Sequence, residues 1–195
     1  MTPTFLSLTI LGLILLLMFS AFFSGSETAL TAASRARITQ AQRDGDLRAG
    51  RVARLIENRE RLIGAILLGN NLVNTLLTAL TTSLLVALFG NDGFIIAAAT
   101  AIVTILLLVF GEIGPKTYAI SNPDGLAMFV SRPIGLVVAM FAPVVHGVQM
   151  LVNGVLKLFG AGAPEGVDVL AAEAEIRGAV ELHAEEGAVE KDVRH

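Results

Sequence analysis

The stretch LLLVFGEIGPKTYA, from Leu106 to Ala119, places a glutamate at the end of a long apolar segment and follows it with glycine, proline and lysine. Nineteen uncharged residues precede Glu112. An ionised carboxylate at that depth in a bilayer costs roughly 3 kcal/mol on insertion scales. We therefore expect the folded protein to compensate the charge of Glu112.

The composition indicates an integral membrane protein. The chain has 195 residues, of which 54% are hydrophobic and 16% charged, and its mean hydropathy is +0.71. Three uncharged stretches are long enough to cross a bilayer, which predicts an all-α membrane fold. The chain has no cysteine, which excludes disulfides and thiolate metal sites. Its net charge of −3 averages a basic loop and an acidic end, and neither indicates nucleic-acid binding.

We predict three transmembrane helices. The first begins near Thr4, the second covers Leu62–Phe89, and the third begins at Gly93 and runs past Glu112. The N-terminal stretch lacks the basic region of a cleavable signal peptide, so we expect a retained span. Eight arginines lie between residues 35 and 61, whereas the turn at 90–93 has no basic residue. This asymmetry predicts a cytoplasmic arginine loop and an outside N-terminus.

Two segments outside these spans are also apolar. Within the arginine loop, the interspersed apolar residues favour a helix on the membrane surface, with simple anchoring by positive charge as the alternative; they are Ile38, Leu47, Val52, Leu55 and Ile56. The stretch 133–156 contains Pro143, His146, Gln149 and Asn153 and has a basic residue on each flank. We predict a kinked or re-entrant juxtamembrane helix, or a helix pair, that enters and leaves on the cytoplasmic side. A full fourth span is the alternative.

From residue 161 the composition becomes acidic and alternates as in an amphipathic soluble helix. We therefore divide the chain into a membrane domain, residues 1–160, and the start of an acidic cytosolic helical region, residues 161–195. The sequence stops at His195 without a helix stop signal, which suggests a piece of a longer protein.

Glu112 is accompanied by two further polar clusters. Ser20, Ser24 and Glu27 share one helical face, with Ser26 beside them. Asn70 and Asn74 stand one turn apart, with Asn71 adjacent. Such residues often only hydrogen-bond neighbouring helices. Counted inward from the basic edge, however, all three clusters lie near the membrane midplane.

The sequence GEIGPK predicts a break in the third span. Pro115 has no backbone N–H, which frees carbonyls around Phe110 and Gly111. Carboxylate, carbonyl, hydroxyl and amide oxygens together suit Mg²⁺ or Ca²⁺. The alternative is an ion pair between Glu112 and Lys116, which stand at i and i+4. We prefer the cation site because the Gly-Pro pair argues against an intact helix there.

The motifs FFSGSETAL, GNNLVNTLLT and GEIGPKTYA occur in this order and spacing, and in this the chain resembles the transmembrane domain of the CNNM/CorC magnesium transporters. The resemblance covers roughly residues 5 to 160. It implies a homodimer in the bacterial inner membrane, with three spans and a belt of juxtamembrane helices per subunit and a cytoplasmic C-terminus. It also implies Mg²⁺ export coupled to Na⁺.

Carried over by motif, the resemblance implies Mg²⁺ ligands at Ser20, Ser24, Asn70, Gly111 through its carbonyl, and Glu112. It implies that a further group lines the cavity or a sodium site: Ser26, Glu27, Asn71, Asn74, Pro115 and Lys116. ATP binding is implied only for a CBS module that would follow in the parent protein. The preference for Mg²⁺ over Ca²⁺ rests on this resemblance.

Two other classes of function are alternatives for this sequence. A membrane-anchored Mg²⁺ sensor would bind the ion without moving it. An intramembrane hydrolase is suggested by Ser24-Gly25 and His146, but Phe22 stands where a rhomboid-like GxSG motif has glycine, and no HExxH or paired-aspartate motif occurs. We therefore expect no enzyme activity.

Overall fold

The computed structural model describes residues 2–90 and 92–158, which form helices joined by short turns and contain no strand. The elements are α1 (Pro3–Ala32), α2 (Arg35–Arg43), α3 (Leu47–Glu57), α4 (Arg59–Phe89), α5 (Gly93–Leu107), a π-helical turn η1 (Leu108–Ile113), α6 (Gly114–Ser121) and α7 (Pro123–Leu158). The chain divides into two compact units after residue 147, within α7. The acidic region predicted at 161–195 lies outside the described residues.

Four helical runs are long and apolar enough to cross a membrane. They are α1, α4, the continuous run Gly93–Ser121, and residues Pro123–Leu156 of α7. The all-helical, multi-pass membrane class predicted from the sequence is thus confirmed. By length and composition α7 qualifies beside the three predicted spans, so the count of three stays a prediction.

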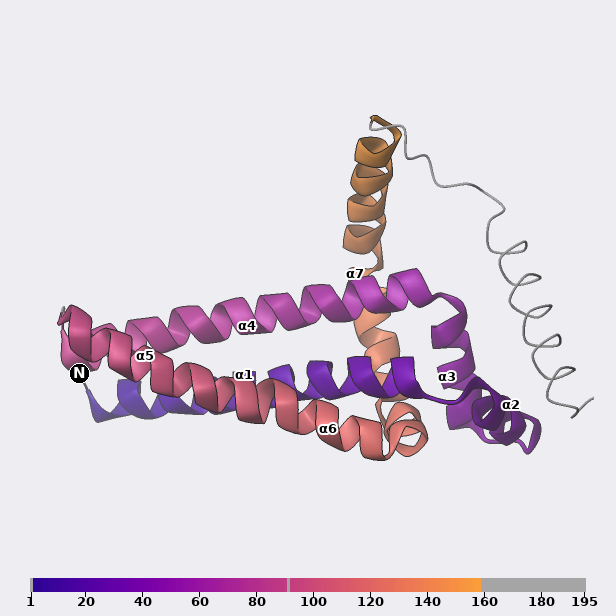
Figure 1. Ribbon diagram of the computed structural model, residues 1–195, viewed down its shortest axis with the longest axis horizontal. Helices are drawn as coiled ribbons and strands as arrows, with labels where there is room; N and C mark the ends of the chain where they lie inside the picture. The colour runs from indigo at the N-terminus through magenta and orange to yellow at the C-terminus, as the bar shows by residue number, and fades with distance from the viewer. Residues whose placement is uncertain (1, 91, 159–195) are drawn as a thin grey trace, which may run out of the picture. The chain divides into compact units, whose positions relative to one another are not determined.

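α1 and α4 pack as antiparallel neighbours along most of their length. A Cβ added at Gly12 would lie 3.3 Å from Leu80, and one added at Gly69 would lie 2.6 Å from the ring of Phe23. The residue numbers therefore fall along α4 as they rise along α1. The run from α5 through α6 follows α1 in parallel, because Gly111 meets Ser20 and Pro115 meets Gly25. Figure 1 shows α4 and the α5–α6 run lying lengthwise beside α1.

The turn between α4 and α5 is fixed by two local features. Gly90 ends α4 with φ +69°, a left-handed conformation that glycine adopts without steric cost. Asp92 caps α5, its carboxylate accepting from the N–H groups of Phe94 and Ile95. The third run therefore starts immediately beside the end of the second.

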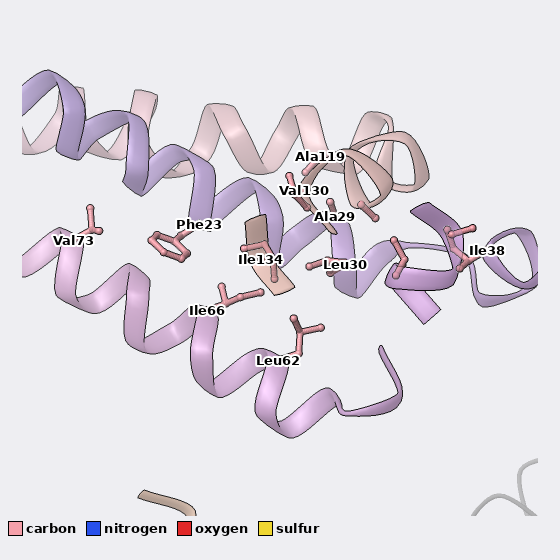
Figure 2. Close-up of a cluster of buried hydrophobic side chains, with 13 residues drawn as sticks. Phe23, Ala29, Leu30, Ile38, Leu62, Ile66, Val73, Ala119, Val130 and Ile134 are labelled. Carbon is pink, nitrogen blue, oxygen red and sulfur yellow. The ribbon is translucent and has the colours of Figure 1, made fainter. Parts of the chain in front are cut away.

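The arginine loop forms two helices, capped by Ser34 before α2 and by Asp46 before α3. Their apolar side differs from the predicted membrane-surface face, because Ile38 and Val52 are buried in the protein core. Leu47 is the exception, with 79% of its surface exposed. Ile38 and Val52 belong to one buried cluster with apolar residues of α1, α4 and α7. Figure 2 shows this core, with Leu30, Ile134, Ile66 and Leu62 in the middle of the view and Ile38 at its right-hand end.

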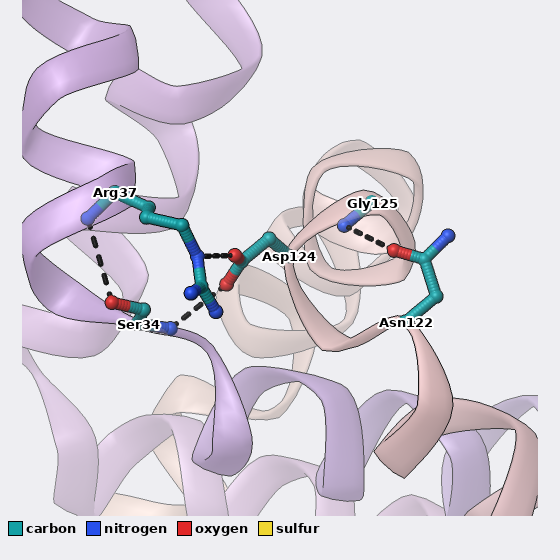
Figure 3. Close-up of polar contacts among 5 residues, drawn as sticks. All are labelled: Ser34, Arg37, Asn122, Asp124 and Gly125. Atoms are coloured by element: carbon teal, nitrogen blue, oxygen red, sulfur yellow. Dashed lines mark hydrogen bonds and ion pairs between the residues drawn. The ribbon is translucent and has the colours of Figure 1, made fainter.

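The first part of α7 is fastened at the arginine-bearing ends of the other helices. Asp124 accepts a hydrogen bond of 2.8 Å from the Ser34 N–H and forms an ion pair with Arg37, as Figure 3 shows. Twenty-one residues later, Val145 packs on Gly64 in the second turn of α4. Both contacts lie at the same ends of α1 and α4, although the helix between them is about 32 Å long.

This placement favours the predicted course of α7, which enters and leaves on the side of the arginine loop, over a fourth crossing. The segment forms one helix containing Pro133 and Pro143 and not the helix pair that the sequence also allowed. Arg51 of α3 donates to Ser131 at 3.3 Å and attaches the middle of this part to the arginine loop. All of these contacts lie within the first compact unit.

Candidate cation site between three helices

A chain of hydrogen bonds joins the three polar clusters. Ser20 Oγ donates to Asn74 Oδ1 at 2.7 Å, and Asn74 Nδ2 lies 3.4 Å from Glu112 Oε1. The chain connects α1 to α4 and α4 to η1. Asn74 is therefore the central residue of the cluster, although the sequence suggested only a surrounding role for it.

Two oxygens one helical turn away from this chain have no partner. Within the part of the chain that the structure describes, Ser24 Oγ and Asn70 Oδ1 are buried without a hydrogen-bond partner. Ser24 follows Ser20 by one turn, and Asn70 precedes Asn74 by one turn. Because α1 and α4 are antiparallel, both oxygens lie on the same side of the Ser20–Asn74 bond, toward the arginine loop. A buried unsatisfied oxygen costs about 1–3 kcal/mol, so such a pair calls for a ligand or an explanation.

Two further hydroxyls, those of Ser26 and Thr81, are buried and unpartnered within the described ranges. Ser26 was among the predicted cavity residues and follows Gly25, which meets Pro115 of α6. Thr81 was not predicted. It lies two turns beyond Asn74 on α4, and the period of the buried α4 face is the signal that could have indicated it.

The third span is not broken as predicted: the helix continues from Gly93 to Ser121, and only its winding changes, in the π turn η1. The backbone keeps right-handed helical angles through η1 and into α6. The Gly114 N–H bonds to Val109, five residues back, and Pro115 has no N–H. Phe110 and Gly111 therefore lose the donors they would have in an α-helix. Single π turns of this kind are frequent at functional sites.

Close backbone approach brings α1 against this turn. A Cβ at Gly111 would lie 3.2 Å from Ser20 Oγ, and one at Gly25 would lie 3.5 Å from the carbonyl oxygen of Pro115. The two glycines therefore allow the serine face of α1 to lie directly on the π turn. Pro115 itself is partly buried in this contact.

The two acidic groups of the cluster have different partners. Glu112 bonds to Asn74, whereas Lys116 Nζ lies 4.0 Å from Glu27 Oε2. The alternative ion pair between Glu112 and Lys116 is thus replaced by one between α6 and α1. Asn71 is exposed on α4 and is not brought into the cluster with Asn70 and Asn74.

The cluster presents neutral oxygens from serine and asparagine side chains together with one carboxylate, that of Glu112. Across residues 2–90 and 92–158 there is no group of three or more His, Asp or Glu side chains that could hold a metal. A cation here would be held by hydroxyl, amide and carbonyl oxygens together with Glu112, a donor set that fits hard cations such as Mg²⁺ or Ca²⁺.

The fold and this cluster define a multi-pass helical membrane domain with polar groups buried between its helices. A sequence model described as "Cyclin M transmembrane N-terminal domain" matches residues 11–193. The chain belongs to this CNNM family, which confirms the resemblance found in its three motifs.

Similar proteins occur in bacteria and plants. The chain is 36% identical over 141 residues to the UPF0053 inner membrane protein YfjD of Escherichia coli, an overlap of 72% of this chain and 32% of that protein. It is 33% identical over 155 residues to a UPF0053 protein of Haemophilus influenzae, covering 80% and 36% of the two chains. It is 36% identical over 152 residues to the chloroplastic DUF21 domain-containing protein At1g55930 of Arabidopsis thaliana, covering 76% and 23%. The chain thus spans about a third of the length of these bacterial relatives.

Proposed function

We propose that this chain is the membrane domain of a Mg²⁺ transporter that exports the ion in exchange for Na⁺ by alternating access. The observation that carries the proposal is the pair of buried, unpartnered oxygens, Ser24 Oγ and Asn70 Oδ1, one helical turn from the hydrogen bonds that link Ser20, Asn74 and Glu112. A divalent cation would satisfy both oxygens and compensate the charge of the partly buried Glu112 in one step.

Each group has a distinct part in this proposal. Ser20, Ser24 and Asn70 supply neutral oxygens, Gly111 supplies a carbonyl and Glu112 supplies charge. Mg²⁺ gives up its water reluctantly and needs near-octahedral ligands at about 2.1 Å, so the site must present its oxygens with little rearrangement. The hydrogen bonds of Asn74 support that role by orienting Ser20 and Glu112.

Sodium would compete for the same oxygens. With half the charge it gains less from Glu112, and this difference provides the coupling in the proposed exchange. The Glu27–Lys116 pair lies toward the arginine loop from the site, where it would line the ion's entry from the cytoplasm.

The wider arrangement is proposed on the family resemblance and the charge pattern. We place the N-terminus outside and the arginine loop in the cytoplasm of a bacterial inner membrane, with the chain acting as a homodimer. A CBS module of the parent protein would bind ATP and regulate transport. Nothing in this proposal involves enzyme catalysis.

The first test is Mg²⁺ binding to the purified chain by calorimetry at several Na⁺ concentrations. Glu112→Ala and Asn70→Ala should each abolish measurable binding, and Na⁺ should weaken binding to the native chain. The matched control is Asn71→Ala, which removes the neighbouring but exposed amide and should bind as the native chain does. Normal binding by Glu112→Ala would refute the site.

Binding alone does not distinguish a transporter from a Mg²⁺ sensor. The chain should therefore be reconstituted in vesicles containing a Mg²⁺-sensitive dye, with a Na⁺ gradient as the driving force. Flux that depends on Na⁺ and disappears in Asn70→Ala supports transport. Binding without flux would favour the sensor.

A further inference from the structure

A small cavity lies away from the cation site, at the arginine-bearing ends of α1 and α4. Its volume is about 30 Å³. Leu30 and Leu62 are buried and form its floor, and Ile56 and Ile63 stand beside them. Arg35 and Arg59, together with Thr31 and Ala33, complete the lining. The cavity therefore combines an apolar floor with two guanidinium groups.

The guanidinium groups of Arg35 and Arg59 have no partner among the described residues, as is also true of Arg43, Arg48 and Arg61 in the same loop. Arg37, by contrast, pairs with Asp124, and Arg51 donates to Ser131. The side chain of Asn58 does not cap the first turn of α4, which leaves backbone N–H groups available beside Arg59. The two guanidinium groups and these N–H groups are hydrogen-bond donors that suit an anion.

The position of the cavity in the membrane indicates which kind of anion it binds. It lies where two membrane-length helices end, on the side that carries eight arginines against four acidic residues between residues 35 and 61. That is the depth of the lipid headgroups. Ile63 is 37% exposed, so apolar surface continues outward from the cavity. Basic pockets between membrane helices on the cytoplasmic side commonly bind anionic lipid headgroups.

We propose that this cavity binds an anionic phospholipid of the leaflet on the arginine side. A cavity of about 30 Å³ is too small for a whole headgroup, so it admits only a phosphate oxygen. The phosphate lies at the mouth between Arg35 and Arg59, and an acyl chain follows the apolar surface past Ile63. This site is independent of the proposed cation transport.

The test uses the full chain in bilayers of phosphatidylcholine with or without phosphatidylglycerol. Lipid retention is measured by native mass spectrometry and stability by thermal unfolding. The native chain should retain phosphatidylglycerol and unfold at higher temperature when it is present. Arg35→Gln with Arg59→Gln should weaken its binding roughly tenfold or more, since each basic group near the surface contributes about 1 kcal/mol. The conservative pair, Arg35→Lys with Arg59→Lys, should keep most of the binding.

The matched control is Arg43→Gln with Arg48→Gln, which removes the same charge from the same loop outside the cavity. Equal loss in this control would mean diffuse surface attraction and would overturn the site. Equal stabilisation by inorganic phosphate in pure phosphatidylcholine would indicate a free-anion site instead of a lipid site. If the Arg35 and Arg59 substitutions destabilise the chain equally without anionic lipid, their partner is an acidic segment of the chain, and the proposal is wrong.

Discussion

At the scale of single residues, small side chains let polar groups meet between the helices. Gly69 precedes Asn70 and Phe23 precedes Ser24, and the Phe23 ring occupies the space that a Cβ at Gly69 would need. The apolar contact between Phe23 and Gly69 thus sets the spacing of the two helices at the level of the unpartnered oxygens. A substitution at Gly69 tests packing without removing a polar group.

Gly69→Ala should destabilise the chain. The new Cβ would lie 2.6 Å from Phe23 Cζ, and the buried ring has to move, which costs about 1–3 kcal/mol in well-packed cores. Thermal unfolding in detergent measures the loss. Gly135→Ala is the control, because a Cβ there meets nothing within 4 Å and should be neutral or stabilising. Adding Phe23→Leu to Gly69→Ala should recover part of the loss, and a Gly69→Ala chain as stable as the control would contradict this account.

At the scale of elements, the π turn η1 connects backbone chemistry to the site. The turn covers Leu108–Ile113 and therefore includes the two proposed ligands Gly111 and Glu112. Pro115 removes one donor, and the bond from Gly114 to Val109 diverts another. Restoring a donor at position 115 would allow ordinary α-helical winding to return.

Pro115→Ala should therefore weaken Mg²⁺ binding without unfolding the helix. The substitution keeps the Cβ that faces Gly25 but supplies an N–H that can bond to the carbonyl of Gly111. A loss of roughly tenfold in affinity is expected, the lower end of the range for altered support of a metal ligand. Calorimetry measures the affinity, and far-UV circular dichroism should show unchanged helix content. Unaltered affinity with intact structure would remove the Gly111 carbonyl from the proposed site.

The sequence predicted the helices and the turn between α4 and α5, but not all of the contacts between helices. Long uncharged runs indicated the helices, and the turn at Gly90 and Asp92 was readable from residue type alone. Helical spacing and depth brought Ser20 and Glu112 to one level, where the structure joins them through Asn74. The central place of Asn74 was not predictable, because it depends on side-chain rotamers across three helices. Nor was the burial of Ile38 and Val52, since an amphipathic pattern does not distinguish lipid from a protein core.

At the scale of the whole molecule, the course of α7 determines on which side of the membrane the following residues lie. Asp124 and Val145 both contact the arginine-bearing ends of other helices, which favours an in-plane course for the part between them. A polar link from Arg51 to Ser131 secures its middle. If α7 does not cross the membrane, the chain has three spans and its later residues lie with the arginine loop.

The absence of cysteine permits a direct test of this topology by labelling with a membrane-impermeant maleimide. Lys157→Cys, in the last turn of α7, should be labelled from the same side as Arg43→Cys in α2. Thr2→Cys, at the exposed start of α1, should be labelled from the opposite side, because α1 alone crosses between it and the loop. Right-side-out and inverted vesicles supply the two sides. Labelling of Lys157→Cys together with Thr2→Cys would mean that α7 crosses the membrane, and its apolar length would then reflect a fourth span rather than a helix at the cytoplasmic surface.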